Sequence, residues 1–278
     1  MEPKGEVPEQ DETTFAKQQL GAKVNESKIL GLSWDKQNDT LKVVFPQVSS
    51  EPTKRSVLAN PTKRSVLANL AKIYDPLGVV SPTTLTGKLI YRDICDHKIA
   101  WDAPIPRQLR ERWQRWENSL PSDVVVPRST VRFQEPIQSI TLHGFGDASA
   151  NGVCAAVYAV VSQESGTTQR LVAAKARLAK RNTTIPRLEL VSAHMATNLI
   201  SNVKKALTVG FLVAEIHAWL DSSVALHWIQ GGGEYKQFVS NRVHKIQAHR
   251  DINWHHVPTT ENSADLGSRG GSVTNAEL

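Results

Sequence analysis

Cysteine is scarce in this chain: Cys95 and Cys154 are the two cysteines among 278 residues. Two thiols cannot build the disulfide framework of a small secreted scaffold, and they fit a reducing compartment. No Cys-x-x-Cys pair occurs either, which argues against a zinc ribbon. The sequence therefore disfavours a fold that depends on disulfides or on a structural zinc ion.

Long apolar runs are also missing. A nearly unbroken run, residues 153–161, is too short to cross a bilayer and suits a buried strand. The N-terminus is acidic and polar, unlike a secretory signal. We expect a soluble protein of the cytoplasm or nucleus, with no membrane partner.

Positive charge is in modest excess, because 33 Lys and Arg residues against 27 Asp and Glu residues give a net charge of +6. This surplus weakly favours a polyanionic partner. The length accommodates one large domain or two small ones, each with its own core.

The N-terminal half begins with a polar lead-in, residues 1–27, that we expect to be disordered. Two apolar segments separated by a polar turn between Ile29 and Phe45 predict a β-hairpin, within residues 28–47. Residues 121–127 are rich in proline at their ends, and we interpret them as a linker into a second domain.

A nine-residue segment, residues 52–60, is repeated without change at 61–69. The second copy predicts a helix capped by Thr62 and ended by Asp75-Pro76, with an apolar face of Val66, Leu67, Leu70, Ile73 and Tyr74. Nine residues rotate a helix by about 900°, half a turn out of phase. The first copy therefore cannot extend that face, and we expect an extra surface loop or short helix without a function of its own.

Residues 107–117 combine arginine with tryptophan, and they admit two interpretations. Basic residues interleaved with tryptophan can grip nucleic acid. Alternatively, the helical spacing of Leu109, Trp113, Trp116 and Leu120 describes the core-facing side of a packing helix, and we favour this interpretation. Residues 85–95 also predict a helix.

From residue 139 onward the pattern changes to strands followed by alternating helices and strands. We expect antiparallel strands at 140–147, 152–161 and 169–175, further strands at 213–220 and 252–257, and helices at 186–207, 222–230 and 238–248.

Four acidic residues lie at the ends of these elements: Asp147, Glu189, Asp221 and Asp265. Each has an ordinary structural explanation, because Asp147 could cap a turn, Glu189 is a helix-end acid, and the other two could cap helices. Together, however, four carboxylates at element ends could converge into an oxygen-rich site for Mg²⁺. Two-metal hydrolysis of a phosphodiester needs such a cluster.

The motifs of the chain, taken together, resemble the Pol polyprotein of BEL/Pao-type retrotransposons. The resemblance covers about residues 14–270 and rests on the segments 29–34, 63–68, 73–82, 146–149 (Gly-Asp-Ala-Ser), 186–190 (Pro-Arg-Leu-Glu-Leu), 219–222 (Trp-Leu-Asp-Ser), 238–243, 256–258 and 262–270 (Asn-Ser-Ala-Asp-Leu-Gly-Ser-Arg-Gly).

This resemblance implies an α/β fold with an RNase H-like mixed five-stranded sheet flanked by helices, over residues 138–270. A mainly helical thumb/connection-like region (53–127) and a β-hairpin from the end of a reverse-transcriptase palm (28–47) would precede it. The expected activity is endonucleolytic cleavage of the RNA strand of an RNA–DNA hybrid by two Mg²⁺ ions, for which Mn²⁺ can substitute. Asp147, Glu189, Asp221 and Asp265 would hold these metals.

The resemblance further implies that the partner is an RNA–DNA hybrid, together with the reverse-transcriptase palm and fingers that this chain lacks, and that no small-molecule cofactor is required. The expected nucleic-acid contacts are Ser149, Asn151, Arg187, Ser222, Asn241 and Arg242; for Asn241 and Arg242 an exposed helix face explains the residues equally well.

Several departures from the family pattern matter. No Tyr-x-Asp-Asp motif occurs, so we expect no polymerase activity. Many RNase H enzymes use a mobile histidine near the last aspartate, yet here His255 and His256 precede residues 259–264, which contain none; His256 is a weak candidate for that role. A catalytically inactive retroelement fragment that binds nucleic acid or acts as a scaffold is the alternative to an active nuclease.

Overall fold

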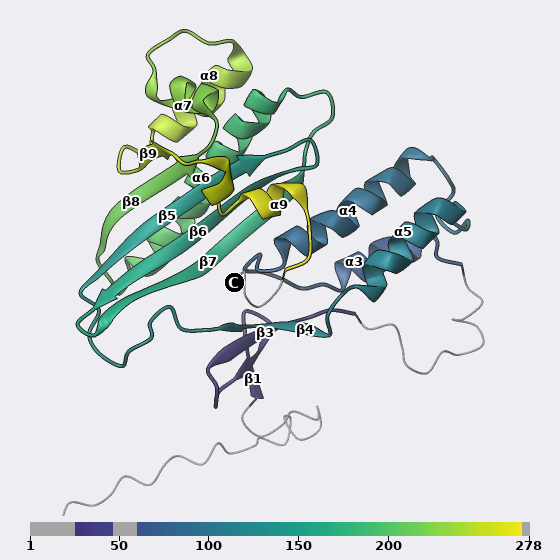
Figure 1. Ribbon diagram of the computed structural model, residues 1–278, viewed down its shortest axis with the longest axis horizontal. Helices are drawn as coiled ribbons and strands as arrows, with labels where there is room; N and C mark the ends of the chain where they lie inside the picture. Colours follow the sequence, from purple (N-terminus) through teal and green to yellow (C-terminus); the bar gives the residue numbers. More distant parts are fainter. Residues whose placement is uncertain (1–25, 47–59, 274–278) are drawn as a thin grey trace, which may run out of the picture.

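The computed structural model describes residues 26–46 and 60–273. The expected lead-in up to residue 25 and the first repeat copy up to residue 59 lie outside these ranges. Figure 1 shows two sheets and a helical layer, with the larger sheet built from the C-terminal half of the chain.

The smaller sheet is antiparallel, in the order β1-β2-β3-β4, with β1 (Glu26–Ile29), β2 (Leu32–Asp35), β3 (Thr40–Val44) and β4 (Asp123–Pro127). The predicted hairpin is confirmed as β2–β3, whose turn begins where Asp35 accepts the N–H of Gln37 at 2.9 Å. Two expectations were wrong. The first strand is divided because Leu30 and Gly31 have φ of 52° and 81°, and residues 123–127 are a strand paired with β3 instead of a linker.

Three helices form the layer beside this sheet: α3 (Lys63–Ala71), α4 (Ser81–Asp96) and α5 (Arg107–Asn118). Thr62 caps α3 as predicted, through a reciprocal bond pair with Ser65. However, α3 ends before Ile73, and Leu67 and Tyr74 are exposed, so they do not belong to its buried face.

The interpretation of α5 as a packing helix is confirmed. Its Leu109, Trp113 and Trp116 are buried in one cluster with Ile90 and Ile94 of α4. The Trp116 indole N–H donates to the carbonyl of Thr83 at 3.2 Å, so its polar atom has a partner inside the core.

The larger sheet has the order β7-β6-β5-β8-β9. Its strands are β5 (Ser139–Ala148), β6 (Gly152–Gln163), β7 (Gly166–Leu178), β8 (Val213–Leu220) and β9 (Asn253–His256). β5, β6 and β7 pair antiparallel, whereas β8 and β9 continue from β5 in parallel. All five strands were expected from the sequence, and together they form the mixed sheet that the resemblance implied.

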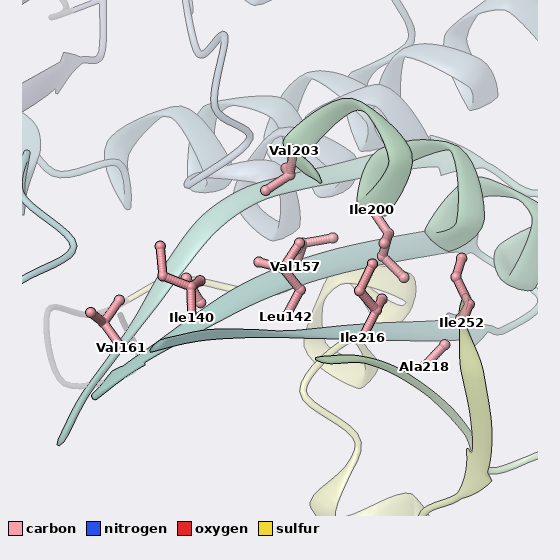
Figure 2. Close-up of a cluster of buried hydrophobic side chains, with 10 residues drawn as sticks. Ile140, Leu142, Val157, Val161, Ile200, Val203, Ile216, Ala218 and Ile252 are labelled. Atoms are coloured by element: carbon pink, nitrogen blue, oxygen red, sulfur yellow. The ribbon is translucent and has the colours of Figure 1, made fainter. Parts of the chain in front are cut away.

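Helix α6 (Ile185–Leu207) crosses one face of this sheet. Figure 2 shows Ile200 and Val203 of α6 pointing toward apolar side chains of the strands, among them Leu142 and Val157. The helix lies so close that a Cβ atom on Gly144 would approach Ile200 Cδ1 to 2.3 Å. This packing fixes the position of α6 relative to β5.

Three more helices follow: α7 (Ser223–Gln230), α8 (Gln237–Gln247) and, after a 3-10 turn at Thr259–Glu261, the short α9 (Asp265–Arg269). In Figure 1, α9 lies in front of the strands and α6 behind them, so the two helices cover opposite faces.

The two halves of the chain are joined along β7, where the N–H of Ala174 donates to the carbonyl of Leu77 at 2.7 Å. The assignment of residues 28–47 and 53–127 to palm and thumb/connection stays a prediction. None of the described helices is both long and apolar enough to span a membrane.

Candidate active site

The candidate site lies where three elements end or begin on one edge of the larger sheet. Asp147 is the penultimate residue of β5, and Asp221 directly follows β8. Because β5 and β8 are parallel neighbours with Phe145 opposite Trp219, their carboxyl ends meet at the same edge. The packing of α6 against β5 brings Glu189, the fifth residue of that helix, to the same place.

Three of the four predicted acids converge. Asp147, Glu189 and Asp221 each offer a carboxylate oxygen, and these oxygens lie within 4.8 Å of one another. They line an open cavity of about 360 Å³, whose wall also contains Asp265 and Arg269. Asp147 and Glu189 are 3% and 5% exposed, so the carboxylates have lost most of their water.

Burial and mutual repulsion both act on these acids. Desolvation raises the pKa of Glu189 to about 9, and the neighbouring Asp147 and Asp221 add to this. Desolvation also raises the pKa of Asp147 to about 6, although a hydrogen bond from Ser268 opposes the shift. Glu189 Oε2 and Asp221 Oδ1 are buried and have no hydrogen-bond partner among the described residues.

This donor set fits a hard divalent cation. Magnesium prefers carboxylate oxygens, and a cation would both neutralise the like charges and occupy the unpartnered oxygens. Asp147, Glu189 and Asp221 are the residues that would hold it. A bound cation would thus account for three converging carboxylates, two of them buried and that of Asp221 half-buried, none of which forms an ion pair with a described Lys or Arg side chain.

Asp265 lies at the wall of the cavity but is not one of the three converging acids. Its carboxylate forms an ion pair with Arg269, one helical turn later, at 2.7 Å. It still contributes to the raised pKa of Asp147. Its position at the start of α9 was expected, but the residue before it, Ala264, is the N-cap.

The ordinary structural explanations fail for two more of the acids. Asp147 is paired within the sheet, opposite Cys154, and Ser149 caps the following turn by accepting the N–H of Asn151 at 3.0 Å. Ser222, and not Asp221, caps α7, because its hydroxyl accepts the N–H of Ala225 at 3.2 Å. Neither acid is therefore needed as a cap of the turn or the helix.

The six residues expected to contact nucleic acid occupy three places, and their role stays a prediction. Ser149 and Asn151 line the cavity, and Ser222 is the α7 cap. The other three lie on the surface of α6 and α8: Arg187, Asn241 and Arg242.

Two of these surface residues, Arg187 and Arg242, are organised around one aromatic ring. Their guanidinium carbons lie 5.4 Å and 3.7 Å from the ring centre of Phe238. Arg242 also donates to the carbonyl of Phe238 at 2.9 Å, which restricts its side chain. Asn241 is exposed on α8.

No histidine in the described ranges lines the cavity. His256 is exposed at the end of β9, and the ring of His255 contacts the ring of His217 through a 3.0 Å hydrogen bond. The proposed product-release role of His256 stays a prediction.

Sequence reasoning missed three residues of the site: Asn262, Ser268 and Arg269. Asn262 and Ser268 are buried, and both contact the carboxylate of Asp147. The signal was present, because all three belong to the segment 262–270 that carried part of the resemblance.

Comparisons with solved structures find RNase H proteins among the matches. The N-terminal RNase H domain of Rv2228c from Mycobacterium tuberculosis aligns at 19% identity over 47% of this chain and 93% of that one, with a TM-score of 0.32. RNase H1 from the archaeon Halobacterium salinarum NRC-1 aligns at 19% identity over 45% and 89%, with a TM-score of 0.30.

A foamy viral protease-reverse transcriptase, solved in complex with an RNA/DNA hybrid, aligns over 90% of this chain at 13% identity and a TM-score of 0.43. The match spans 31% of that longer protein. The search of curated proteins found no match.

The sequence itself matches a family model, the Pao retrotransposon-like RNaseH-like domain, over residues 62–222. The match includes Asp147, Glu189 and Asp221, and it begins at the cap of α3, well before the larger sheet. It confirms the resemblance to BEL/Pao-type Pol proteins and the RNase H-like fold. The chain belongs to the Pao retrotransposon-like RNaseH-like domain family.

Proposed function

We propose that this chain is an RNase H-type endonuclease that hydrolyses the RNA strand of RNA–DNA hybrids and requires Mg²⁺. The observation that carries the proposal is the convergence of Asp147, Glu189 and Asp221, with unpartnered buried oxygens, at one edge of the sheet. Family membership supports the same class of enzyme.

Asp147, Glu189 and Asp221 would bind two Mg²⁺ ions, or Mn²⁺ as a substitute, and Asp265 would complete the set from the wall. Bound at this site, the ions would supply an activated water and stabilise the leaving oxygen. The chain then needs no nucleophile of its own. The role of the carboxylates is to hold a fixed, largely dehydrated geometry in which electrostatic interactions are strong.

Substrate binding requires positive charge beside this acidic cavity. Arg187 lies two residues before Glu189 on α6 and is exposed, and Arg242 lies beside it across Phe238. We assign these arginines to phosphate contacts, because guanidinium groups bind phosphate oxygens well. Ser149, Asn151, Ser222 and Asn241 would add neutral contacts.

The smaller sheet and the helical layer correspond, in this proposal, to the palm end (28–47) and the thumb/connection region (53–127) of a reverse transcriptase. Their partners would be the palm and fingers of the full polymerase together with the hybrid. We propose no polymerase activity for this chain, because no Tyr-x-Asp-Asp motif occurs in it.

The deciding experiment is cleavage of an end-labelled RNA–DNA hybrid by the purified chain with Mg²⁺, beside the Asp147→Asn variant and matched RNA and DNA duplexes. We expect cleavage of the RNA strand of the hybrid alone, and none by the variant. Hybrid binding without cleavage would support the alternative, an inactive binding or scaffolding fragment. Equal cleavage by Asp147→Asn would reject the site.

A further inference from the structure

The short helix α9 contributes a buried hydroxyl to the acid cluster. Ser268 has no exposed surface, and its hydroxyl contacts Asp147 Oδ2. Asn262, just before α9, approaches the other oxygen of the same carboxylate at 3.4 Å and donates to the carbonyl of Gly146 at 3.0 Å. Asp147 is thus held on both oxygens by residues from a segment more than 110 positions away.

The Ser268 proton has two possible acceptors. Besides Asp147 Oδ2, the carbonyl of Asp265 lies 3.1 Å from the hydroxyl. A hydroxyl has one proton to donate, and a charged carboxylate is the stronger acceptor. We therefore assign the proton to Asp147. Each carboxylate oxygen retains a second lone pair, so this bond leaves Asp147 able to bind a cation.

The turn after β5 holds α9 in place. The Ser149 hydroxyl donates to the carbonyl of Ser268 at 2.8 Å, and the Asn151 amide donates to the carbonyl of Arg269 at 3.1 Å. The helix lies close to the sheet, because a Cβ atom on Gly267 would come within 2.2 Å of Cys154 Sγ. The polar turn thus connects the backbone of α9 to the strand that carries Asp147.

From these contacts we infer that Ser268 is a positioning residue that fixes the orientation of the Asp147 carboxylate for metal binding, and that Ser149 maintains this contact by anchoring α9. The inference deepens the proposed nuclease function and rests on it. It also gives Ser149 and Asn151 a role within the protein, besides any contact with nucleic acid.

The test compares Ser268→Ala with Ser272→Ala, an exposed serine of the same segment. Mn²⁺ binding is measured by calorimetry, and hybrid cleavage is measured as separate kcat and KM values. We expect Ser268→Ala to weaken Mn²⁺ binding and to lower kcat by about 10- to 100-fold each, the range for residues that orient metal ligands. KM for the hybrid should be unchanged, and Ser272→Ala should match the parent chain.

Loss of a purely structural serine would not be expected to lower kcat while leaving KM unchanged. Ser149→Ala should lower kcat in the same direction but less, because Asn151 still holds α9. Unchanged Mn²⁺ affinity and kcat in Ser268→Ala would overturn the inference.

A separate readout distinguishes a failure of the proposed nuclease function from a failure of the role assigned to Ser268. If the parent chain neither cleaves the hybrid nor binds Mn²⁺, the proposed function fails. Crystal structures of the parent and Ser268→Ala chains then decide on Ser268 alone. A rotated Asp147 carboxylate in the variant supports its positioning role, and an unmoved one refutes it.

Discussion

Two regions of the molecule each take a carboxylate out of water, and they treat it in opposite ways. In the loop after α3, Asp75 accepts three backbone N–H groups, from Gly78, Val79 and Val80, at 2.8–3.0 Å. In the cavity at the end of β5, Glu189 instead faces two other carboxylates and retains an unpartnered oxygen. Desolvation raises the pKa of both acids.

The difference separates a structural acid from a functional one. The protein satisfies Asp75 with its own N–H groups, so that acid completes a loop and needs nothing from outside. The cluster around Glu189 instead has buried oxygens without a hydrogen-bond partner. Unsatisfied buried groups of this kind indicate a site at which a ligand binds. Burial alone would not have distinguished the two.

The largest expected effect is on catalysis. Glu189→Gln keeps the shape of the side chain but removes a charge that the metals require, and we expect the cleavage rate to fall by at least about 100-fold. The same change should raise the Tm in the absence of metal, because folding of the parent chain near neutral pH requires Glu189 to take up a proton, whereas a glutamine is neutral in both states. Hybrid cleavage and thermal unfolding in EDTA would check both parts.

A variant that lost activity and also unfolded more easily would contradict this explanation, since it would make Glu189 a structural acid. The corresponding amide at an exposed acid, Glu164→Gln, is the matched control, and it should change neither property.

Asp75→Ala should show the opposite pattern. It leaves buried N–H groups without an acceptor, and we expect it to destabilise the fold by about 2–3 kcal/mol. The folded fraction should keep its cleavage rate, because Asp75 is not among the residues that line the cavity. Urea unfolding gives the free energy, and activity per folded molecule gives the rate. If kcat per folded molecule fell in Asp75→Ala, Asp75 would not be a purely structural acid, and the difference between the two regions would disappear.

The pH dependence of stability offers a third test. Asp147 and Glu189 have folded pKa values of about 6 and about 9, above their ordinary values of 3.8 and 4.5. Folding therefore binds protons, and the stability that these groups contribute is full below about pH 4 and is lost as the pH rises to about 9. Chemical unfolding in EDTA between pH 5 and 9 should show this decline.

Mg²⁺ should reverse the slope of the unfolding free energy against pH, because it binds the ionised cluster and stabilises the folded state. Glu189→Gln in EDTA should flatten most of the decline. If the stability of this variant fell with rising pH as steeply as that of the parent chain, the pH dependence would not come from Glu189.

Much of this site was readable from the sequence, for a definite reason. Asp147 and Asp221 follow strands with clear apolar patterns, and the carboxyl ends of neighbouring parallel strands share one edge. The first turn of α6 was equally plain, because Pro186 occupies a position that suits a helix start. Local patterns were therefore sufficient to place three of the acids.

Other features depend on long-range contacts that no local pattern contains. The pairing of β4 with β3 joins residues about 80 positions apart, so residues 121–127, with a proline at each end, resembled a linker. The contact between Ser268 and Asp147 spans 121 positions. A serine in a short polar segment gives no indication of such a partner.

The smallest expected effect distinguishes members of the acid cluster itself. Asp265 is already paired with Arg269 and lies outside the group of three oxygens, so its charge is partly neutralised by the protein. We expect Asp265→Asn to lower kcat by about 10-fold, equivalent to about 1.4 kcal/mol, clearly less than Glu189→Gln. Arg269→Gln, which frees Asp265, should increase the affinity for Mn²⁺. If Asp265→Asn were as damaging as Glu189→Gln, Asp265 would have to leave Arg269 in the working enzyme, and four equivalent acids would replace the arrangement of three.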